Sequence, residues 1–145
     1  MTLTRWSLVR FVHVLAAMGW VGGQLVLSAV VLPALRANLG PAERVPLIRA
    51  AARRFGTLAN VVLLPTLVVT GAALAWHRGV RFGTLGKAGY GRLLAIKLSL
   101  VAVAIVLAAV HGILATRRPR SARPLGIAGL ITSVGIVVFA TALVP

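Results

Sequence analysis

Four long apolar stretches constrain this chain more than any other feature of its sequence. They cover Leu8–Leu32, Phe55–Trp76, Leu93–Ala115 and Leu125–Val144. Each approaches or exceeds the ~20 residues that a helix needs to span a bilayer, whereas a β-barrel would need shorter, alternating segments. Because the chain is 59% hydrophobic and 12% charged, it has too few polar residues to cover a soluble domain. The sequence predicts an all-α integral membrane protein, a four-transmembrane-helix bundle that forms one domain over residues 1–145.

The segment between the first two spans combines apolar and basic residues at helical spacing. Val45, Ile48 and Phe55 recur on one face, with arginines between them. Residues 42–54 are therefore predicted to form a basic amphipathic helix that either lies at the lipid surface or extends the second span. Pro65, in the middle of that span, is expected to kink or locally loosen the helix.

The charge balance narrows the classes of partner. The net charge is +15, and Glu43 is the only acidic residue. Because the basic residues cap apolar spans, anionic lipid headgroups are the expected partner, and nucleic acid is not. The chain has no cysteine, which excludes a disulfide, an iron–sulfur cluster and thiolate metal ligands. A proton relay through Asp or Glu is equally excluded from the spans.

Two ionisable residues inside the apolar runs are the leading candidates for function. His13 and Lys97 lie at about the same depth near one membrane face, and such residues are costly in hydrocarbon. Since the second span runs the opposite way, Thr70 is expected at the same depth as His13. His77 is expected about two turns nearer the surface.

The surroundings of His13 favour a flat, anionic cofactor. One face of the first span carries His13, a small residue and Trp20, and small residues leave room for a ring. A histidine in a membrane helix bundle suits axial ligation of b-type haem iron. Arg10 and Arg92 lie near the same face and could bind the haem propionates. The preferred hypothesis is therefore a haem b protein that performs electron transfer, or an oxidase step on a tetrapyrrole or quinone.

Other interpretations of these residues stay open. His13 could simply hydrogen-bond within the bundle, and Lys97 could be a second iron ligand, a propionate partner or a snorkelling surface residue. A copper-handling protein that uses His13, His77 and Met18 is the alternative, and a structural subunit without cofactor is a third.

His111, two heptads after Lys97, points to a similar face about 21 Å lower and could serve a second cofactor, a water path or a structural polar layer. A homodimer is plausible for so small and glycine-rich a bundle.

Three segments resemble a known membrane family. FVHVLAAMGWVGGQLVLSAVVLPAL resembles the first helix of the copper-resistance D (CopD) family, with a His, a Trp-x-Gly-Gly and a Leu-Pro in that order. It is also similar to the HemJ-type protoporphyrinogen oxidases. RRFGTLANVVLLPTLVVTGAALA and YGRLLAIKLSLVAVAIVLAAVHG resemble the second and third helices, and the likeness covers Arg10 to Arg118.

The resemblance implies roles for particular residues. Lys97 matches a lysine of the family, and His111 is similar to its later histidine. In the HemJ branch the resemblance implies b-type haem, held with the help of His13 and Lys97, and oxidation of protoporphyrinogen IX. In the CopD branch it implies copper uptake or tolerance.

The basic residues also predict the orientation in the cell membrane. Four spans put both termini on one face, side A, which carries six basic residues, while the opposite face, side B, carries nine and Lys97 completes the sixteen. The positive-inside rule makes side B cytoplasmic, with both termini outside. A topology reporter fused after Pro145 is expected to give an external signal, and a cytoplasmic signal would reverse the orientation while leaving the number of spans unchanged.

Overall fold

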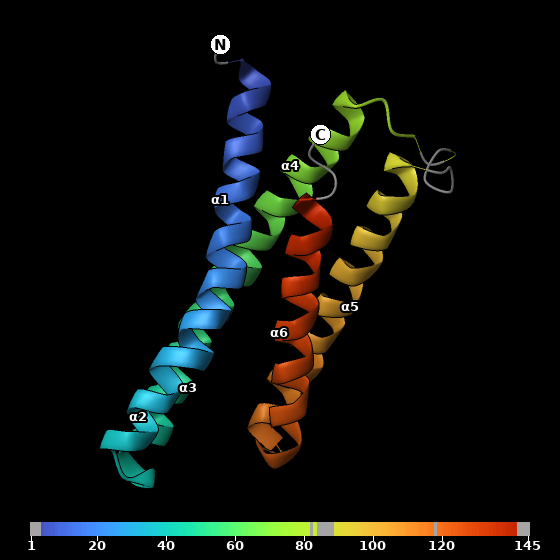
Figure 1. The fold of residues 1–145 in the computed structure, drawn as a ribbon. Helices are drawn as coiled ribbons and strands as arrows, with labels where there is room; N and C mark the ends of the chain where they lie inside the picture. Colours follow the sequence, from blue (N-terminus) through green and yellow to red (C-terminus); the bar gives the residue numbers. More distant parts are fainter. Residues whose placement is uncertain (1–3, 82, 84–88, 118, 142–145) are drawn as a thin grey trace. The chain divides into compact units, whose positions relative to one another are not determined.

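The protein is built from two helical hairpins. The computed structural model describes residues 4–81, 83, 89–117 and 119–141, and within these ranges the regular structure is helical, without strands. The chain divides into two compact units, Met1–Gly79 and Val80–Pro145 (Figure 1). Among the described residues, four helices are long and apolar enough to cross a membrane, as the sequence predicts: Arg5–Asn38, Pro41–His77, Gly91–His111 and Pro124–Thr141.

The first unit is a hairpin of two long antiparallel arms. The first arm consists of α1 (Arg5–Val26), the π-helical turn η1 (Leu27–Val31) and α2 (Leu32–Asn38). The second consists of α3 (Pro41–Leu58), the π-helical turn η2 (Ala59–Leu63) and α4 (Leu64–His77). A capping box between Thr4 and Ser7 begins α1, and the extended backbone of Gly40 separates the arms. Pro41 then occupies the first turn of α3, where its missing N–H costs nothing.

Each π-helical turn ends two residues before a proline. The Leu32 N–H bonds to the Leu27 carbonyl, and the Leu64 N–H bonds to the Ala59 carbonyl, so each turn is one residue wider than an α-helical turn. Pro33 and Pro65 follow directly. A proline ring clashes with the carbonyl four residues earlier, and a wider turn relieves that clash without ending the helix. This is the local loosening predicted at Pro65. The same device at Pro33 was not predicted.

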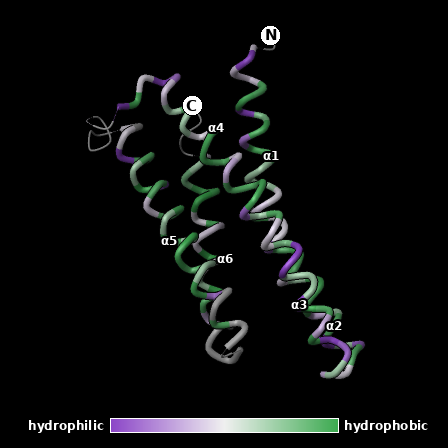
Figure 2. The backbone as a smooth tube through the Cα atoms, turned by 180° about the vertical axis from the view of Figure 1, so that it is seen from behind, coloured by the Kyte–Doolittle hydropathy of each residue, from purple (hydrophilic) through white to green (hydrophobic). Residues whose placement is uncertain are grey.

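The basic segment before the second span extends that span. Helix α3 continues through η2 into α4 without a break, so the second of the two arrangements predicted for residues 42–54 is correct. The continuous helix Pro41–His77 has 37 residues. At ~1.5 Å per residue it is about 55 Å long, well beyond the ~30 Å hydrocarbon core. Figure 2 shows hydrophilic residues at the α2–α3 end of this hairpin and near the N-terminus, with hydrophobic residues between.

Glycines on α1 allow close packing against the second arm. A Cβ atom at Gly23 would lie 2.2 Å from Cε2 of Phe55, and one at Gly19 would lie 3.3 Å from Cδ2 of Leu63. The Phe55 ring therefore lies directly on the α1 backbone. Such contacts matter in a membrane, where close van der Waals packing replaces the hydrophobic effect between helices.

The second unit is a simpler hairpin of α5 (Tyr90–Arg117) and α6 (Pro119–Thr141). On α5 a heptad-spaced set of residues is less exposed than its neighbours, namely Leu93, Lys97, Leu100, Ala104, Leu107 and His111. Ala104 is 4% exposed and Ser133 on α6 is 2% exposed, so small residues form the tightest part of this unit. The predicted shared face of Lys97 and His111 is therefore confirmed. Residues 142–144, at the end of the predicted fourth span, lie outside the described residues.

The Gly23–Phe55 contact provides a test of the first hairpin. Gly23→Ala should lower the free energy of unfolding by about 1–3 kcal/mol, because the added methyl group overlaps the Phe55 ring. Gly22→Ala is the matched control, since a Cβ there meets nothing within 4 Å. Thermal unfolding in detergent would measure both. Equal stability of the two variants would contradict the packing described here, and Phe55→Leu should partly rescue Gly23→Ala.

Candidate functional site

His13 and Thr70 form a hydrogen-bonded pair between α1 and α4. His13 Nδ1 lies 2.7 Å from Thr70 Oγ1, and Thr70 Oγ1 donates to the carbonyl of Thr66 at 2.5 Å. Since the single hydroxyl proton of Thr70 is used in the second bond, its oxygen accepts the first bond from His13 Nδ1–H. The lone pair of the ring is therefore on Nε2, the nitrogen that can bind a metal. The prediction that Thr70 lies at the depth of His13 is correct.

A glycine on the opposing helix makes room for the His13 ring. A Cβ atom at Gly71 would lie 3.2 Å from Cε1 of His13. The ring is half-buried and lies against the backbone of α4 at this point. Small residues were predicted beside His13 on its own helix, whereas Gly71 lies on the facing helix. Thr70 and Gly71 thus fix the position and the tautomer of His13 together.

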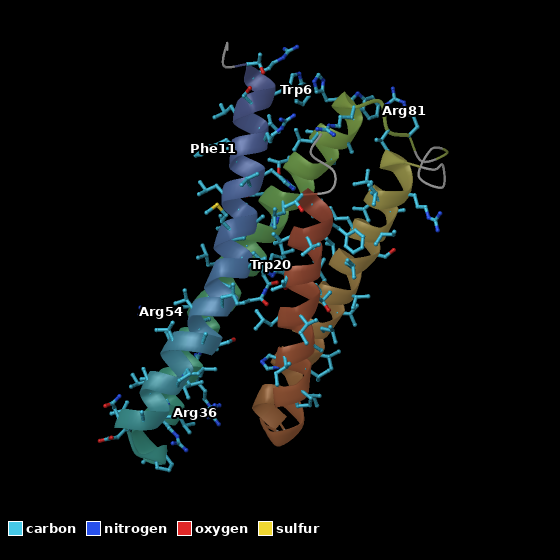
Figure 3. The ribbon with its side chains drawn as sticks, in the orientation of Figure 1. Trp6, Phe11, Trp20, Arg36, Arg54 and Arg81 are labelled. Atoms are coloured by element: carbon cyan, nitrogen blue, oxygen red, sulfur yellow. The ribbon has the colours of Figure 1, made fainter. Side chains whose placement is uncertain are left out.

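His77 lies in a second layer, nearer the end of the hairpin. Its ring stacks on Trp6, with ring centroids 3.9 Å apart and planes inclined by 12° (Figure 3). Trp6 precedes His13 by seven residues, and His77 follows Thr70 by seven, so the layers are about 10 Å apart along the helices. The side chain of His77 is exposed. At this separation His13 and His77 cannot bind one ion together.

The other residues predicted on the first hairpin have different environments. Trp20, 9% exposed, is one of the most buried side chains of α1 and lies seven residues beyond His13. Arg10 is exposed, one turn before His13. Met18 is 65% exposed, so its thioether is directed away from the packed face that carries His13. The alternative in which Met18 and His13 share a copper site is not supported by this geometry.

The remaining predicted residues belong to the second hairpin. Arg92 is exposed near the start of α5, and Lys97 is half-buried on the α5 face that packs against α6. His111 lies lower on that face, where a Cβ atom at Gly126 of α6 would be 3.1 Å from its Cε1. Each hairpin therefore places a histidine ring against a glycine of the opposite helix.

These residues do not assemble into a metal cage. Within the described part of the chain, no three histidine, cysteine or acidic side chains come close enough to hold one metal ion. The predicted ligands are instead spread over three places: His77 at the end of the first hairpin, His13 deeper in it, and His111 in the second. Within the first hairpin, the His13 and His77 rings lie in two layers about 10 Å apart along the helices.

The Trp6–His77 stack and the role of Gly71 were not predicted from the sequence. The spacing of the residues does indicate the stack, because Trp6 and His13 are seven residues apart on one helix, and Thr70 and His77 are seven apart on its antiparallel partner. Equal spacing on antiparallel helices places the two pairs in register. Gly71 could not be found this way because its contact depends on the rotation of α4.

The His13–Thr70 bond can be tested by nitrogen NMR of the histidine rings. In the native protein the ring proton of His13 should reside on Nδ1, because Thr70 Oγ1 accepts a hydrogen bond from Nδ1–H. Thr70→Val should release this tautomer and lower stability by about 1 kcal/mol, whereas Thr70→Ser should preserve both. The signal of His13 is assigned by comparison with His13→Gln. A native ring protonated on Nε2 would show that the hydrogen-bond assignment is wrong.

Comparison with known proteins identifies the family. The family model described as copper resistance protein D, CopD, matches residues 49–144, about two thirds of the chain. The match includes α4, α5 and α6, with His77, Lys97 and His111, and it begins after the helix that carries His13. No curated protein and no solved structure matches the chain. The predicted likeness to HemJ-type oxidases therefore stays a prediction, while the chain belongs to the CopD family of membrane proteins.

Proposed function

We propose that this protein handles copper as a cargo within the membrane, with His13 as a ligand during passage. The proposal rests on one combination: the chain matches the copper resistance protein D family, and the His13 ring is oriented with a metal-binding nitrogen inside a span. The Thr70 hydroxyl would not touch the metal. By accepting a hydrogen bond from Nδ1–H of His13, it keeps the lone pair of the ring on Nε2, the nitrogen that would bind the metal.

The composition leaves imidazole as the main ligand available from the protein. The chain has no cysteine, and Met18 is the only methionine besides the first residue. Imidazole suits copper, although thiolates and thioethers are softer ligands for Cu(I). The three histidines are thus the side chains best suited to the ion.

The separation of the His13 and His77 layers favours movement of the ion over storage. A three-ligand or four-ligand cage would hold copper tightly, and no such group is found among the described residues. Passage through a membrane requires sites that bind well enough for entry and weakly enough for release. Single ligands at separate levels meet this requirement, so transport is favoured over sequestration.

Copper uptake into vesicles tests the role of His13. Purified protein in liposomes should raise copper entry above that of empty liposomes, and His13→Ala should reduce the increase to near zero. Thr70→Val should reduce it less, because the ligand is retained but loosely oriented. Met18→Leu is the matched control on the same helix, and it should leave uptake unchanged since its side chain is exposed. Native uptake in the His13→Ala variant would overturn this role.

Haem b binding is a second candidate, favoured by the single oriented imidazole of His13. Haem iron needs only one protein ligand on a face, and exposed Arg10, one turn away, could bind a propionate. Trp20, on the same hairpin as His13, would line the predicted haem site, while Lys97 and Arg92, which are also predicted haem contacts, belong to the second hairpin. When bound, haem would supply one-electron chemistry, with a quinone or tetrapyrrole as the predicted substrate.

An optical spectrum separates the two candidates. A haem protein purified after expression with ample haem should show a Soret band that His13→Ala removes or shifts. A colourless native protein that raises copper uptake would exclude the haem candidate. A Soret band without copper uptake would exclude the copper proposal.

A further inference from the structure

Two groups of residues on the first hairpin lie about one bilayer thickness apart. At one end the Trp6 ring stacks on His77, next to exposed Trp76, and tryptophans gather at the membrane–water interface. Arg54, exposed on α3, precedes His77 by 23 residues along one continuous helix (Figure 3). At ~1.5 Å per residue this separation is about 34 Å, slightly more than the ~30 Å hydrocarbon core. The arginines of α3 therefore begin at the level where the hydrocarbon ends.

Three arginines form a basic strip on α3 at this level, namely Arg49, Arg53 and Arg54. Arg49 and Arg53 are one turn apart on one face of the helix, and Arg54 follows directly. All three side chains are exposed, and within the described part of the chain none of them pairs with Glu43, the only acidic residue. Arg49 lies about 7 Å beyond Arg54, so the basic strip crosses the layer of lipid headgroups. Its guanidinium groups are available to an anion from outside the chain.

The first arm presents apolar side chains beside the basic strip. The contact of Gly23 with the Phe55 ring fixes the register of the two arms. From this contact, Val26 and Val30 lie three and seven residues along the first arm, while the basic strip lies one to six residues back along α3. Because the arms are antiparallel, the two valines and the basic strip lie at about the same depth. Val26 is 53% exposed and Val30 is 60% exposed, so an apolar and a basic surface occur together at the membrane surface.

The pairing of these two surfaces distinguishes between classes of anion. A small anion such as phosphate would neutralise the arginines but leave the valines in water. A phospholipid has a phosphate, which a guanidinium group binds through two hydrogen bonds, and an acyl chain, which covers apolar side chains. A lipid with a net negative charge is favoured further, because each basic residue near an anionic membrane surface strengthens binding roughly fivefold. An anionic phospholipid therefore matches both surfaces.

We propose that the basic strip and the neighbouring valines form a binding site for an anionic phospholipid, such as phosphatidylglycerol, in the leaflet at the α2–α3 end of the first hairpin. The basic strip binds the phosphate, and an acyl chain covers Val26 and Val30. The bound lipid fixes the depth of the hairpin in the membrane, because the strip stays with the headgroups. The site is independent of the proposed copper function, since Val26 follows His13 by 13 residues, about 20 Å along the helix.

Lipid retention measures the site directly. The protein is reconstituted with equal amounts of phosphatidylglycerol and phosphatidylcholine, and native mass spectrometry after detergent extraction identifies the lipids that stay bound. The native protein should retain phosphatidylglycerol in preference. Arg49→Gln combined with Arg53→Gln should lower this preference by roughly 25-fold, about fivefold for each arginine. Equal retention of the two lipids by the native protein would overturn the proposal.

The matched control is Arg5→Gln combined with Arg10→Gln, because it removes the same charge from exposed positions at the opposite end of the first hairpin. This control should leave the preference for phosphatidylglycerol nearly unchanged. An equal loss in the two double variants would show that retention follows net charge alone, which would overturn the site on α3. If a double variant does not fold, the single variants Arg53→Gln and Arg10→Gln give the same comparison with a smaller change.

Two further measurements separate a phospholipid from a free phosphate. Glycerol 3-phosphate, which has the phosphate but no acyl chain, should fail to displace bound phosphatidylglycerol even at a large excess. Val30→Ser should lower the retention of phosphatidylglycerol several-fold, although the arginines are intact. Displacement by glycerol 3-phosphate, together with native retention by the Val30→Ser variant, would show that the basic strip binds phosphate alone and would overturn the assignment to a lipid.

Discussion

The contact of a histidine ring with a glycine of the opposing helix is the constraint on which both hairpins depend. His13 lies against Gly71 and His111 against Gly126, and in each case a Cβ atom on the glycine would come within about 3.2 Å of the ring. In lipid, helices gain little from burying apolar side chains against each other, so close approach and hydrogen bonding must hold them together. The contact with Gly71 therefore contributes both to helix packing and to the candidate site. The glycine lets α1 and α4 approach closely, and this approach brings Thr70 within hydrogen-bonding distance of His13.

The length of the first hairpin follows from how it accommodates its prolines. Pro33 and Pro65 would end or kink an ordinary α-helix, but the π-helical turns before them let each arm continue. The arms consequently reach 34 and 37 residues, more than a bilayer requires. The excess is concentrated at the basic α2–α3 end, where arginines are stable only in water or among headgroups. The apolar part of the hairpin, which contains His13, is then the part expected in the hydrocarbon. The prolines and the arginines thus help to set the depth of the candidate site.

Counting residues along antiparallel spans predicted much of this arrangement. The four spans, the shared depth of His13 and Thr70 and the shared face of Lys97 and His111 all follow from a fixed rise per residue and a fixed helical period. The rotation of one helix about its axis relative to another leaves no comparable pattern in the sequence. The contact of Gly71 with His13 and the burial of Ser133 were therefore not predicted. The widened turn at Pro33 was missed for a related reason, since a proline near the end of an apolar run can terminate a helix as readily as it widens one. Met18 was considered as a ligand on chemical grounds alone, and the structure shows its side chain exposed.

A threonine beside a histidine has different consequences from a carboxylate in the same place. A carboxylate would orient the ring and also add negative charge, which strengthens the hold on a bound metal. Thr70 orients the ring by accepting a hydrogen bond from Nδ1–H and adds no charge, so in the proposed copper role His13 would be a positioned, neutral ligand. A weakly held ion is easily released to the next site, whereas a tightly held one is retained. In the proposed copper role, the neutral hydroxyl of Thr70 would therefore favour reversible binding at His13.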